Sequence, residues 1–559
     1  MTTRIGVAFF AFIALFMVAT GVWFGIIGWA PLPYQDQWDH ATAQALTGNL
    51  FTPHNEHRII LARMTFWLDI WFGHDRGTIP LAFVYLFNLA HTVLLIALTR
   101  WTWPEASRLR LMATAALIFA FFFSGYQYEN FISGFQDQFT GVFFFASAAI
   151  VVLAYGAKKT LTSRVGFIVL SMSCAALSVA CMSSGLLVTL LLPLAALCLG
   201  LPVTAGAYVL FAVACWALYL IDYPVTETGI LSQLFTRPVG VLLDLLAYLG
   251  GAVPNSVIVL LAPFSQKLAL ARTFGLIGLA GSLGIVALLI RRVQRERPQV
   301  IAWATILVFL IGVGVLTALG RSVFGAESLL SNRYGAGTAG LWAALAAWAI
   351  MPARAWRSGP ALAGAVLVLL LLAVAQASWL GGVQAIKYFK RDAEAALLMR
   401  IDAPELYKPI YPDPVRPPTV SGVLRQQHLS LFSDPWSQLD GQPLAARNAT
   451  ACPSAPTDAK VAAHGAASRV SLTVKTPGAT QALAVLDANG KVVGLLIRGM
   501  TGDLASSTLG WRHHPPIWSG FVKAAGSDQG PKLDVWAIDA DGHGLCRLNH
   551  PVEITVSAG

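Results

Sequence analysis

Residues 1–30 read MTTRIGVAFFAFIALFMVATGVWFGIIGWA and hold a single charged side chain, Arg4, among about 25 apolar residues. A stretch of this length can cross a lipid bilayer as one helix. It is longer than the apolar core of a cleaved signal peptide, and its end, Gly28-Trp-Ala-Pro31, is a poor cleavage site. We therefore expect a retained membrane-spanning helix here.

The same apolar character continues along most of the chain. The 559 residues are 56% hydrophobic and 12% charged, with a mean hydropathy of +0.64, well beyond ordinary soluble domains. The sequence therefore predicts an α-helical polytopic membrane protein with about eleven spans. The expected spans are 5–29, 78–99, 109–125, 138–157, 165–182, 184–201, 204–221, 272–290, 299–319, 336–352 and 360–381.

The net charge of +10 comes largely from basic residues in the loops between these spans. With a cytoplasmic N-terminus, the basic residues gather in short inner loops, as the positive-inside rule requires, so no nucleic-acid partner is needed to explain them. These are Arg100, Arg108, Arg110, Lys158, Lys159, Arg164, Arg291, Arg292, Arg295, Arg297, Arg354 and Arg357. The outer loops are then 31–77, 124–137, 222–272 and 320–335, and the C-terminal part also lies outside.

The segment 239–263 is apolar enough to span, but counting it would move residues 291–297 to the outer side. We therefore expect an interfacial or re-entrant helix there, interrupted at Gly250-Gly251 and Pro254.

The chain divides by composition into a transmembrane part, 1–385, and two later parts. Residues 386–449 are polar and rich in proline, which predicts a short helix and a linker. Residues 450–559 contain strand-like runs at 469–475, 482–486, 492–498, 533–539 and 553–556, which predict a small antiparallel β-sandwich. Cys452 and Cys546 can form a disulfide there if the compartment is oxidising, whereas the other four cysteines lie in apolar stretches as packing residues.

The first outer loop contains Pro33-Tyr-Gln-Asp-Gln-Trp-Asp-His40. If residues 35–46 form a helix, Asp36 and Asp39 lie close enough to share a substrate or a cation. The alternative is that Asp36 caps this helix and Asp39 stabilises its first turn. Trp38 between them is typical of an anchor at the membrane surface.

The same loop continues with His54-Asn-Glu-His-Arg58, ahead of an amphipathic run. Asn55 is suited to cap that helix and Arg58 to bind membrane lipid headgroups. Alternatively, Glu56, His57 and Arg58 can orient a phosphate and move a proton. A zinc site on His54 and His57 is disfavoured because the pattern is not HExxH, so we expect no metal ligands here.

Two further outer loops carry polar residues. Residues 124–138 combine Tyr128, Glu129 and Gln136, which suit a sugar site, although tyrosines at an interface are also routine anchors. The second loop holds Arg321, Arg333 and Tyr334 on the side that usually avoids basic residues. Its two guanidinium groups can hold a phosphate, or an Arg–Glu ion pair simply fixes the loop.

No nucleotide-binding loop, nucleophile elbow or CxxC metal pair is present in the sequence. The layout of an acidic first outer loop, amphipathic helices, about eleven spans and an outer C-terminal domain resembles the GT-C superfamily, glycosyltransferases that use polyprenyl-phosphate-linked sugars. Its members include protein mannosyltransferases, lipid A aminoarabinose transferases and bacterial O-antigen glucosyltransferases. Three short stretches look like segments of bacterial multi-span proteins of this type, namely Asn55-Glu-His-Arg58, Leu330-Ser-Asn-Arg-Tyr334, and Leu424-Arg with Leu429-Ser-Leu-Phe432.

The resemblance implies a transferase in a bacterial inner membrane that acts on a periplasmic glycan or lipid. Asp36, preferred over Asp39, would be the general base, and direct displacement predicts inversion. Arg58, Arg321 and Arg333 would hold the donor phosphate. The spacing Asp-Gln-Trp-Asp leaves any need for Mg²⁺ or Mn²⁺ open. The periplasmic β domain would bind an acceptor glycan or cover the site.

Three alternatives compete with this hypothesis. A flippase or transporter of lipid-linked glycans would need charged residues at bilayer depth, and His91 and Asp244 come nearest to that. A glycan polymerase or ligase would use a similar lipid-linked donor. An assembly protein would use its β domain to bind partners.

Overall fold

The structure is a computed structural model that describes most of the chain. The residues outside the description are 1, 43–49, 224–231, 254–263, 292–297, 353–357, 446–449, 454–455, 457, 465–466, 500–516, 524–531, 549–551 and 554–559. The chain forms two compact units that alternate along the sequence. We call them the helical unit (Met1–Ile26, Asn49–Thr65 and Pro80–Leu380) and the mixed unit (Ile27–Gly48, Phe66–Ile79 and Gly381–Gly559).

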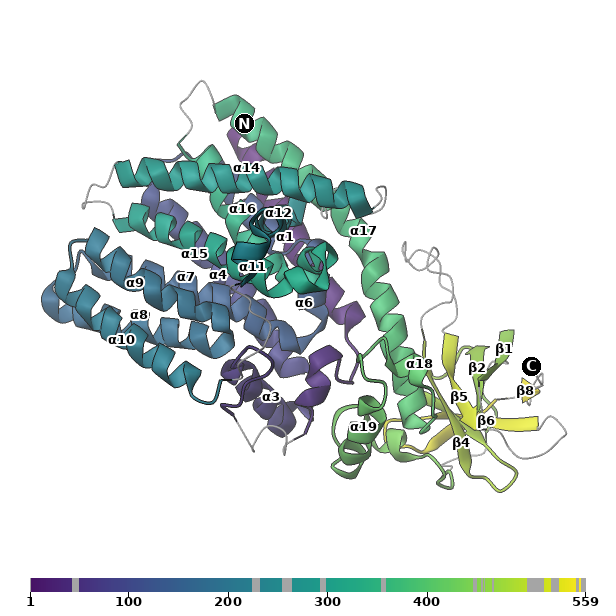
Figure 1. The fold of residues 1–559 in the computed structure, drawn as a ribbon. Helices are drawn as coiled ribbons and strands as arrows, with labels where there is room; N and C mark the ends of the chain where they lie inside the picture. Colours follow the sequence, from purple (N-terminus) through teal and green to yellow (C-terminus); the bar gives the residue numbers. More distant parts are fainter. Residues whose placement is uncertain are drawn as a thin grey trace. The chain divides into compact units, whose positions relative to one another are not determined.

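The helical unit consists of long apolar helices (Figure 1). They are α1 (Thr2–Gly28), α4 (Thr78–Thr102), α5 (Arg108–Phe122), α6 (Tyr128–Ile132), α7 (Asp137–Gly156), α8 (Leu161–Cys181), α9 (Leu186–Cys198), α10 (Pro202–Leu220), α11 (Ser232–Thr236), α12 (Pro238–Gly250), α14 (Phe264–Arg291), α15 (Pro298–Arg321), α16 (Gly335–Ile350) and α17 (Ser358–Leu398), the last of which continues into the mixed unit. Short 3-10 turns join several of them, namely η2 (Gly125–Gln127), η3 (Gly134–Gln136), η4 (Ser183–Gly185), η5 (Ser322–Phe324), η6 (Ala326–Leu330) and η7 (Asn332–Tyr334).

Nine helices among the described residues are long and apolar enough to cross a membrane. The prediction of a polytopic helical membrane protein is therefore confirmed, whereas the count of eleven spans is not. Two expected spans, 184–201 and 336–352, coincide with α9 and α16, which have only 13 and 16 residues. Both are shorter than the roughly 17 residues that a spanning helix needs.

Three helix ends that flank expected inner loops contact one another in the helical unit. Trp103, which follows α4, packs edge-on against Trp348 of α16 with ring centroids 5.0 Å apart, and the Arg110 guanidinium donates to the Met351 carbonyl at 3.0 Å. The Trp303 indole at the start of α15 donates to the Thr102 hydroxyl at 3.0 Å. These contacts join segments that the alternation of spans places on one side.

Helix α12 packs closely on α14 within the segment that we expected to be interfacial or re-entrant. A methyl group on Gly250 would lie 1.9 Å from the Ala271 carbonyl oxygen, and one on Gly275 would lie 1.8 Å from that of Leu246. Glycine is therefore required at both positions of this crossing. Helix α12 has 13 residues and ends at Gly250, and Pro254 lies outside the described residues, so whether 239–263 crosses the membrane stays a prediction.

The mixed unit contains an antiparallel sheet of eight strands with the order β1-β2-β5-β4-β3-β6-β7, and β8 pairs with β6. Its strands are β1 (Asp458–His464), β2 (Ala467–Thr473), β3 (Ala482–Leu486), β4 (Val492–Arg498), β5 (Ile517–Lys523), β6 (Lys532–Ile538), β7 (Gly544–Arg547) and β8 (Val552–Glu553). A C-terminal antiparallel β domain is thus confirmed. The described strands form one connected sheet, and its folding as the expected β-sandwich stays a prediction.

Both faces of this sheet are buried. Along β3, Ala482, Ala484 and Leu486 belong to one core cluster, while Leu483 and Val485 belong to another. Alternate side chains of a strand point to opposite faces, so each face packs against its own cluster. The second cluster also contains Cys452 and Cys546, which form a disulfide with Cα atoms 5.0 Å apart.

The first cluster packs against segments that we expected to be a linker or a surface anchor. Helices α18 (Pro404–Tyr407) and α19 (Arg416–Gln426) and the turns η9 (Ser430–Phe432) and η10 (Pro435–Gln438) place Tyr407, Leu424 and Phe432 in this core. Trp38 is buried in the same core with 1% of its surface exposed, so its expected role as a membrane-surface anchor is wrong. Apolar contacts on one sheet face order the proline-rich segment.

The expected helix over residues 35–46 is also wrong among the described residues. A 3-10 helix, η1 (Gln35–Asp39), forms instead, and Tyr34 rather than Asp36 precedes it. The Gln37 side chain accepts from the Tyr34 N–H at 3.1 Å, which fixes the start of the turn. Residues 43–49 lie outside the description.

Candidate functional site

The segment His54 to His57 forms a tight hairpin rather than a helix cap. The His54 N–H donates to the His57 carbonyl at 2.7 Å, and the His57 N–H donates back at 3.0 Å. Asn55 at its tip has a φ of +51°, a left-handed conformation that asparagine tolerates better than most residues. The following amphipathic helix, α3 (Ile60–Gly73), begins five residues later, so the expectation that Asn55 caps it is wrong.

The end of α10 holds this hairpin in place through Arg58. The Arg58 side chain, 7% exposed, donates to the carbonyls of Phe51, Tyr219 and Ile221, and its backbone N–H donates to the Tyr219 hydroxyl at 2.9 Å. The Tyr223 hydroxyl also donates to the Glu56 carbonyl at 3.0 Å. A cation is favourable where a helix ends in unpaired carbonyls. These contacts assign Arg58 a structural role in the hairpin.

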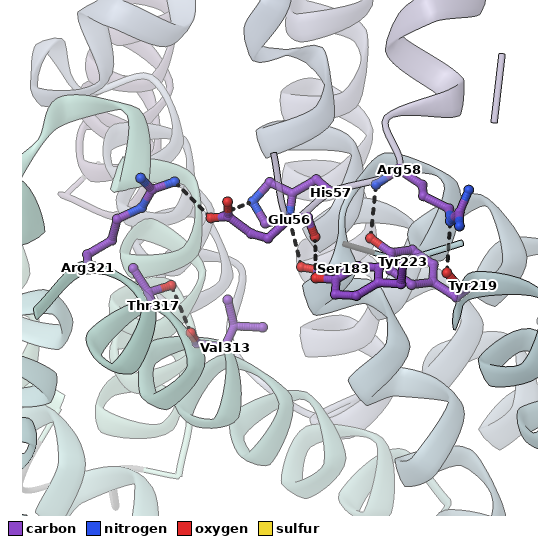
Figure 2. Close-up of polar contacts among 9 residues, drawn as sticks. All are labelled: Glu56, His57, Arg58, Ser183, Tyr219, Tyr223, Val313, Thr317 and Arg321. Atoms are coloured by element: carbon purple, nitrogen blue, oxygen red, sulfur yellow. Dashed lines mark hydrogen bonds and ion pairs between the residues drawn. The ribbon is translucent and has the colours of Figure 1, made fainter. Parts of the chain in front are cut away.

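The hairpin presents Glu56 and His57 to two other segments of the helical unit (Figure 2). The His57 Nδ1 atom lies 2.7 Å from the Ser183 hydroxyl oxygen in η4. The Glu56 carboxylate lies 3.6 Å from His57 Nε2 and 3.3 Å from the Arg321 guanidinium at the end of α15. Ser183, His57, Glu56 and Arg321 therefore form a continuous polar line.

The imidazole of His57 is neutral in this setting. Burial lowers the pKa of His57 to about 4, assisted by Arg321 and His54 and opposed by the Glu56 carboxylate. A neutral imidazole has one donor and one acceptor nitrogen, so it can transmit a proton between a hydroxyl on one side and a carboxylate on the other.

A second ion pair lies near the first. The Arg333 guanidinium in η7 is 3.9 Å from the Glu129 carboxylate of α6, and Ser331 bridges them, donating to Glu129 at 3.4 Å and accepting from Arg333 at 3.2 Å. Tyr334 lies within the electrostatic reach of both pairs. Burial raises the pKa of the Tyr334 hydroxyl, Arg321 and Arg333 lower it, and the two carboxylates raise it.

Five segments that are far apart in the sequence converge in this cluster. They are the hairpin at 54–57, the α6 region, η4, the end of α10 and the loop from Arg321 to Tyr334. Each lies where the alternation of spans predicts an outer loop or an outer helix end. Their contacts place them at one end of the helical unit, while the side of the membrane stays a prediction.

Tyr128 and Gln136 lie in the same polar region of sequence but make other contacts. The Tyr128 ring packs against Trp379 with centroids 5.4 Å apart, which fits an anchoring role. The Gln136 side chain is 8% exposed, and its Oε1 atom has no hydrogen-bond partner among the described residues. A buried amide oxygen without a partner is costly, which makes Gln136 a candidate to contact a ligand.

Asp36 and Asp39 both belong to the mixed unit. Asp39 accepts from the Tyr411 hydroxyl at 2.9 and 3.1 Å and lies 3.5 Å from the Arg416 guanidinium. Its carboxylate therefore joins η1 to Tyr411 and to the first residue of α19. These contacts give Asp39 a structural role, and the assignment of Asp36 as the general base stays a prediction.

Metal-binding geometry occurs within the mixed unit at Asp539, Asp541 and His543, whose ligand atoms lie within 4.8 Å of one another. The hairpin between β6 and β7 accounts for this cluster, because Asp539 accepts from the His543 N–H at 2.9 Å, as Asp487 does from Lys491 in the β3–β4 hairpin. In the helical unit, Ser183 already occupies the Nδ1 side of His57.

Sequence reasoning missed several partners in the site. Ser183 is the single residue between the expected spans 165–182 and 184–201, and Tyr219 and Tyr223 lie four positions apart at a span end. That helical spacing at a membrane boundary was a usable signal. The partnership of Ser183 with His57, 126 residues away, had no sequence signal.

No family model, no curated protein and no solved structure matches this chain. The function is therefore argued from the site itself.

Proposed function

We propose that the protein is a membrane glycosyltransferase that moves a sugar from a polyprenyl-phosphate donor to a periplasmic glycan or lipid. The proposal includes a GT-C-like arrangement of about eleven membrane helices in a bacterial inner membrane, with the N-terminus in the cytoplasm. It needs a site for an anionic phosphate beside a membrane.

One observation carries the proposal: the end of α15 and the loop that follows it hold two partly exposed arginines, Arg321 and Arg333. The side chains of Arg321 and Arg333 are 29% and 38% exposed, and each is held at one side by a carboxylate. Guanidinium groups oriented in advance can bind a phosphate bidentately and stabilise its charge as the sugar departs. Because Arg58 is occupied by carbonyls, the phosphate role rests on Arg321 and Arg333.

The transfer is a single displacement. An acceptor oxygen bonds to the anomeric carbon, the bond from that carbon to the phosphate oxygen breaks, and the phosphate retains the electron pair. The hydroxyl proton passes to a carboxylate base. Attack opposite the leaving group inverts the anomeric configuration. As the phosphate departs, a proton that moves along the polar line from Ser183 to Glu56 changes the charge beside Arg321.

The proposal is tested by comparing cell-surface glycans from a deletion strain complemented with wild-type protein or with Arg321→Gln. We expect a mass difference of one sugar between the deletion and the wild type. Arg321→Gln should reduce that modification about a hundredfold, since losing one preorganised donor typically costs that much. The control is Arg100→Gln, an exposed arginine at the end of α4. Unchanged glycans in the deletion strain, or full activity of Arg321→Gln at equal protein level, would refute the proposal.

A transporter or flippase is the second candidate, favoured by buried polar groups in the helical unit. The Asp137 side chain is fully buried, and its Oδ2 accepts from the Thr65 hydroxyl at 2.5 Å. Oxygen atoms of Gln136, Asp137 and Gln138 have no hydrogen-bond partner among the described residues. These residues lie at the start of Gly134–Gly156, a helix apolar and long enough to cross a membrane, and buried polar residues in such helices often mark a substrate path. Transbilayer movement of a lipid-linked sugar in vesicles, abolished by Asp137→Asn, would favour this reading.

A further inference from the structure

The mixed unit contains a small pocket outside the arginine cluster. It is lined by Leu32, Pro33, Gln37, Ala41, Phe66, Asp75 and Gly77 and encloses about 230 Å³, including the part open to solvent. The enclosed floor has room for a group about the size of one water molecule. Its walls combine apolar side chains with one carboxyl and one amide, the composition of many small-ligand sites.

A rigid turn presents Asp75 to this pocket. His74 and Asp75 both have left-handed backbones, with φ of +54° and +56°. The turn is held by the Ser430 N–H, which donates to the His74 carbonyl at 2.6 Å, and by the Asp75 N–H, which donates to the Asp69 carbonyl at 3.0 Å. The next residue, Arg76, lies 2.5 Å from the Asp434 carboxylate. Unfavourable backbone conformations persist where surrounding contacts impose them, often at ligand sites.

The Asp75 carboxyl has no evident structural purpose. It is 7% exposed, and its Oδ2 atom has no hydrogen-bond partner among the described residues. Its neighbour Asp69 differs, because it accepts from the N–H groups of Gly77 at 2.6 Å and Ile79 at 2.9 Å. Leaving a buried carboxyl oxygen unpaired costs free energy that a ligand can recover.

The chemistry of the pocket favours a neutral hydroxyl as its ligand. Burial and the nearby Asp69 raise the pKa of Asp75 well above its usual value, so its carboxyl is protonated across a wider pH range. A protonated carboxyl both donates and accepts, as a hydroxyl does. A methyl group would fit the space but leave the Asp75 oxygen unpaired.

We propose that this pocket binds one hydroxyl or hydroxymethyl group of a neutral sugar, with Asp75 and Gln37 as its polar partners and the apolar wall beside the sugar's carbon atoms. The site lies apart from the proposed phosphate-binding arginines in sequence and contacts. Its occupancy requires no sugar donor and no transfer, so it can be tested separately.

The experiment measures binding of methyl glucoside, methyl galactoside, methyl mannoside and glucosamine to the full chain in nanodiscs by ligand-observed NMR. Asp75→Gly removes the carboxyl, and Asp75→Asn keeps its shape without the acid. Both replacements tolerate the left-handed backbone at this position. The matched control is His74→Gly, which changes the exposed neighbour with the same backbone conformation.

We expect at least one neutral glycoside to bind, with affinity reduced about tenfold or more in Asp75→Gly and by less than about threefold in Asp75→Asn and His74→Gly. If Asp75→Gly does not fold, Gln37→Glu carries the same test, because it keeps the oxygen that accepts from Tyr34 and removes the amide donor.

Three results would overturn the inference. In the first, the wild type binds none of the neutral glycosides. In the second, the pocket variants bind them as the wild type does. In the third, Asp75→Asn loses binding as fully as Asp75→Gly, and glucosamine binds best to the wild type. The last result would identify a site for a cationic amine. None of them bears on the transferase proposal, which depends on Arg321 and Arg333.

Discussion

The His57 imidazole lies 2.7 Å from the Ser183 hydroxyl, and these residues are 126 positions apart in the chain. The contact joins the first loop to the turn between α8 and α9. On its other side the imidazole faces Glu56, which pairs with Arg321. The same residue therefore links three segments and keeps a neutral ring between a hydroxyl and an ion pair.

Stability should depend on pH through His57. Because burial lowers the pKa of His57 from 6.5 to about 4, the unfolded chain binds a proton between these values while the folded chain does not. Stability is therefore fully present above pH 6.5 and falls as the pH drops toward 4, by at most about 3 kcal/mol. Thermal unfolding at pH 7.5 and pH 5 should show this loss in the wild type and a smaller one in His57→Gln. The exposed His428→Asn should behave like the wild type, and an equal loss in His57→Gln would contradict the assignment.

Arg58→Gln should reduce folded protein rather than the activity of each molecule. The change leaves carbonyls of Phe51, Tyr219 and Ile221 without their buried donor, at a cost of about 2–4 kcal/mol. Size-exclusion profiles after heating would measure the lower melting temperature, with the exposed Arg108→Gln as the control. If Arg58→Gln has normal stability but no transferase activity, the structural role is wrong and Arg58 is a phosphate-binding residue.

The two first-loop acids should separate in mutagenesis. Asp39→Asn weakens the contacts with Tyr411 and Arg416 and should lower stability by about 1–2 kcal/mol. Tyr411→Phe, which removes the same hydrogen bonds from the other side, should match it. Asp36→Asn should abolish glycan modification at unchanged protein level. Full activity of Asp36→Asn would remove it as the base.

The disulfide should stabilise the mixed unit. Cys452 and Cys546 are 94 residues apart, and closing a loop of that length contributes about 4–5 kcal/mol before strain is subtracted. A reducing agent should lower the melting temperature of the wild type and leave Cys452→Ser/Cys546→Ser unaffected. Cys198→Ser, which changes an exposed unpaired cysteine, should retain the sensitivity of the wild type. Equal melting curves with and without reductant in the wild type would show that the bond contributes nothing.

The sequence predicted the elements with a strong local signal. Runs of about 20 apolar residues predicted the long helices, and short strand-like runs predicted β2, β3, β4 and β6. It missed β1, β5 and β7. Strand β1 is an edge strand rich in alanine, Gly520 and Ser519 interrupt β5, and β7 has only four residues. Periodicity is weakest in short or edge strands, because fewer of their side chains enter the core.

The candidate site was partly predictable, because charged residues are conspicuous in the loops of an apolar chain. Glu56, His57, Arg321 and Arg333 stood out in this way. Glu56 contacts both His57 and Arg321 in the structure, and Arg333 pairs with Glu129. Their pairing was not predictable, and neither were the structural duties of Arg58 and Asp39. Which carbonyl or hydroxyl a side chain reaches depends on segments distant in sequence.

The sequence by itself determined that this chain is a membrane protein of long apolar helices with a C-terminal β domain, because hydrophobic length and alternation are local properties that water and lipid enforce on every segment. Only the tertiary structure decided which polar residues meet. It joined His57 to Ser183 and Glu56 to Arg321, because a buried polar group must find its partner wherever the packing of distant segments places one. It also buried Trp38 in a core and placed Asp75 in the wall of a pocket.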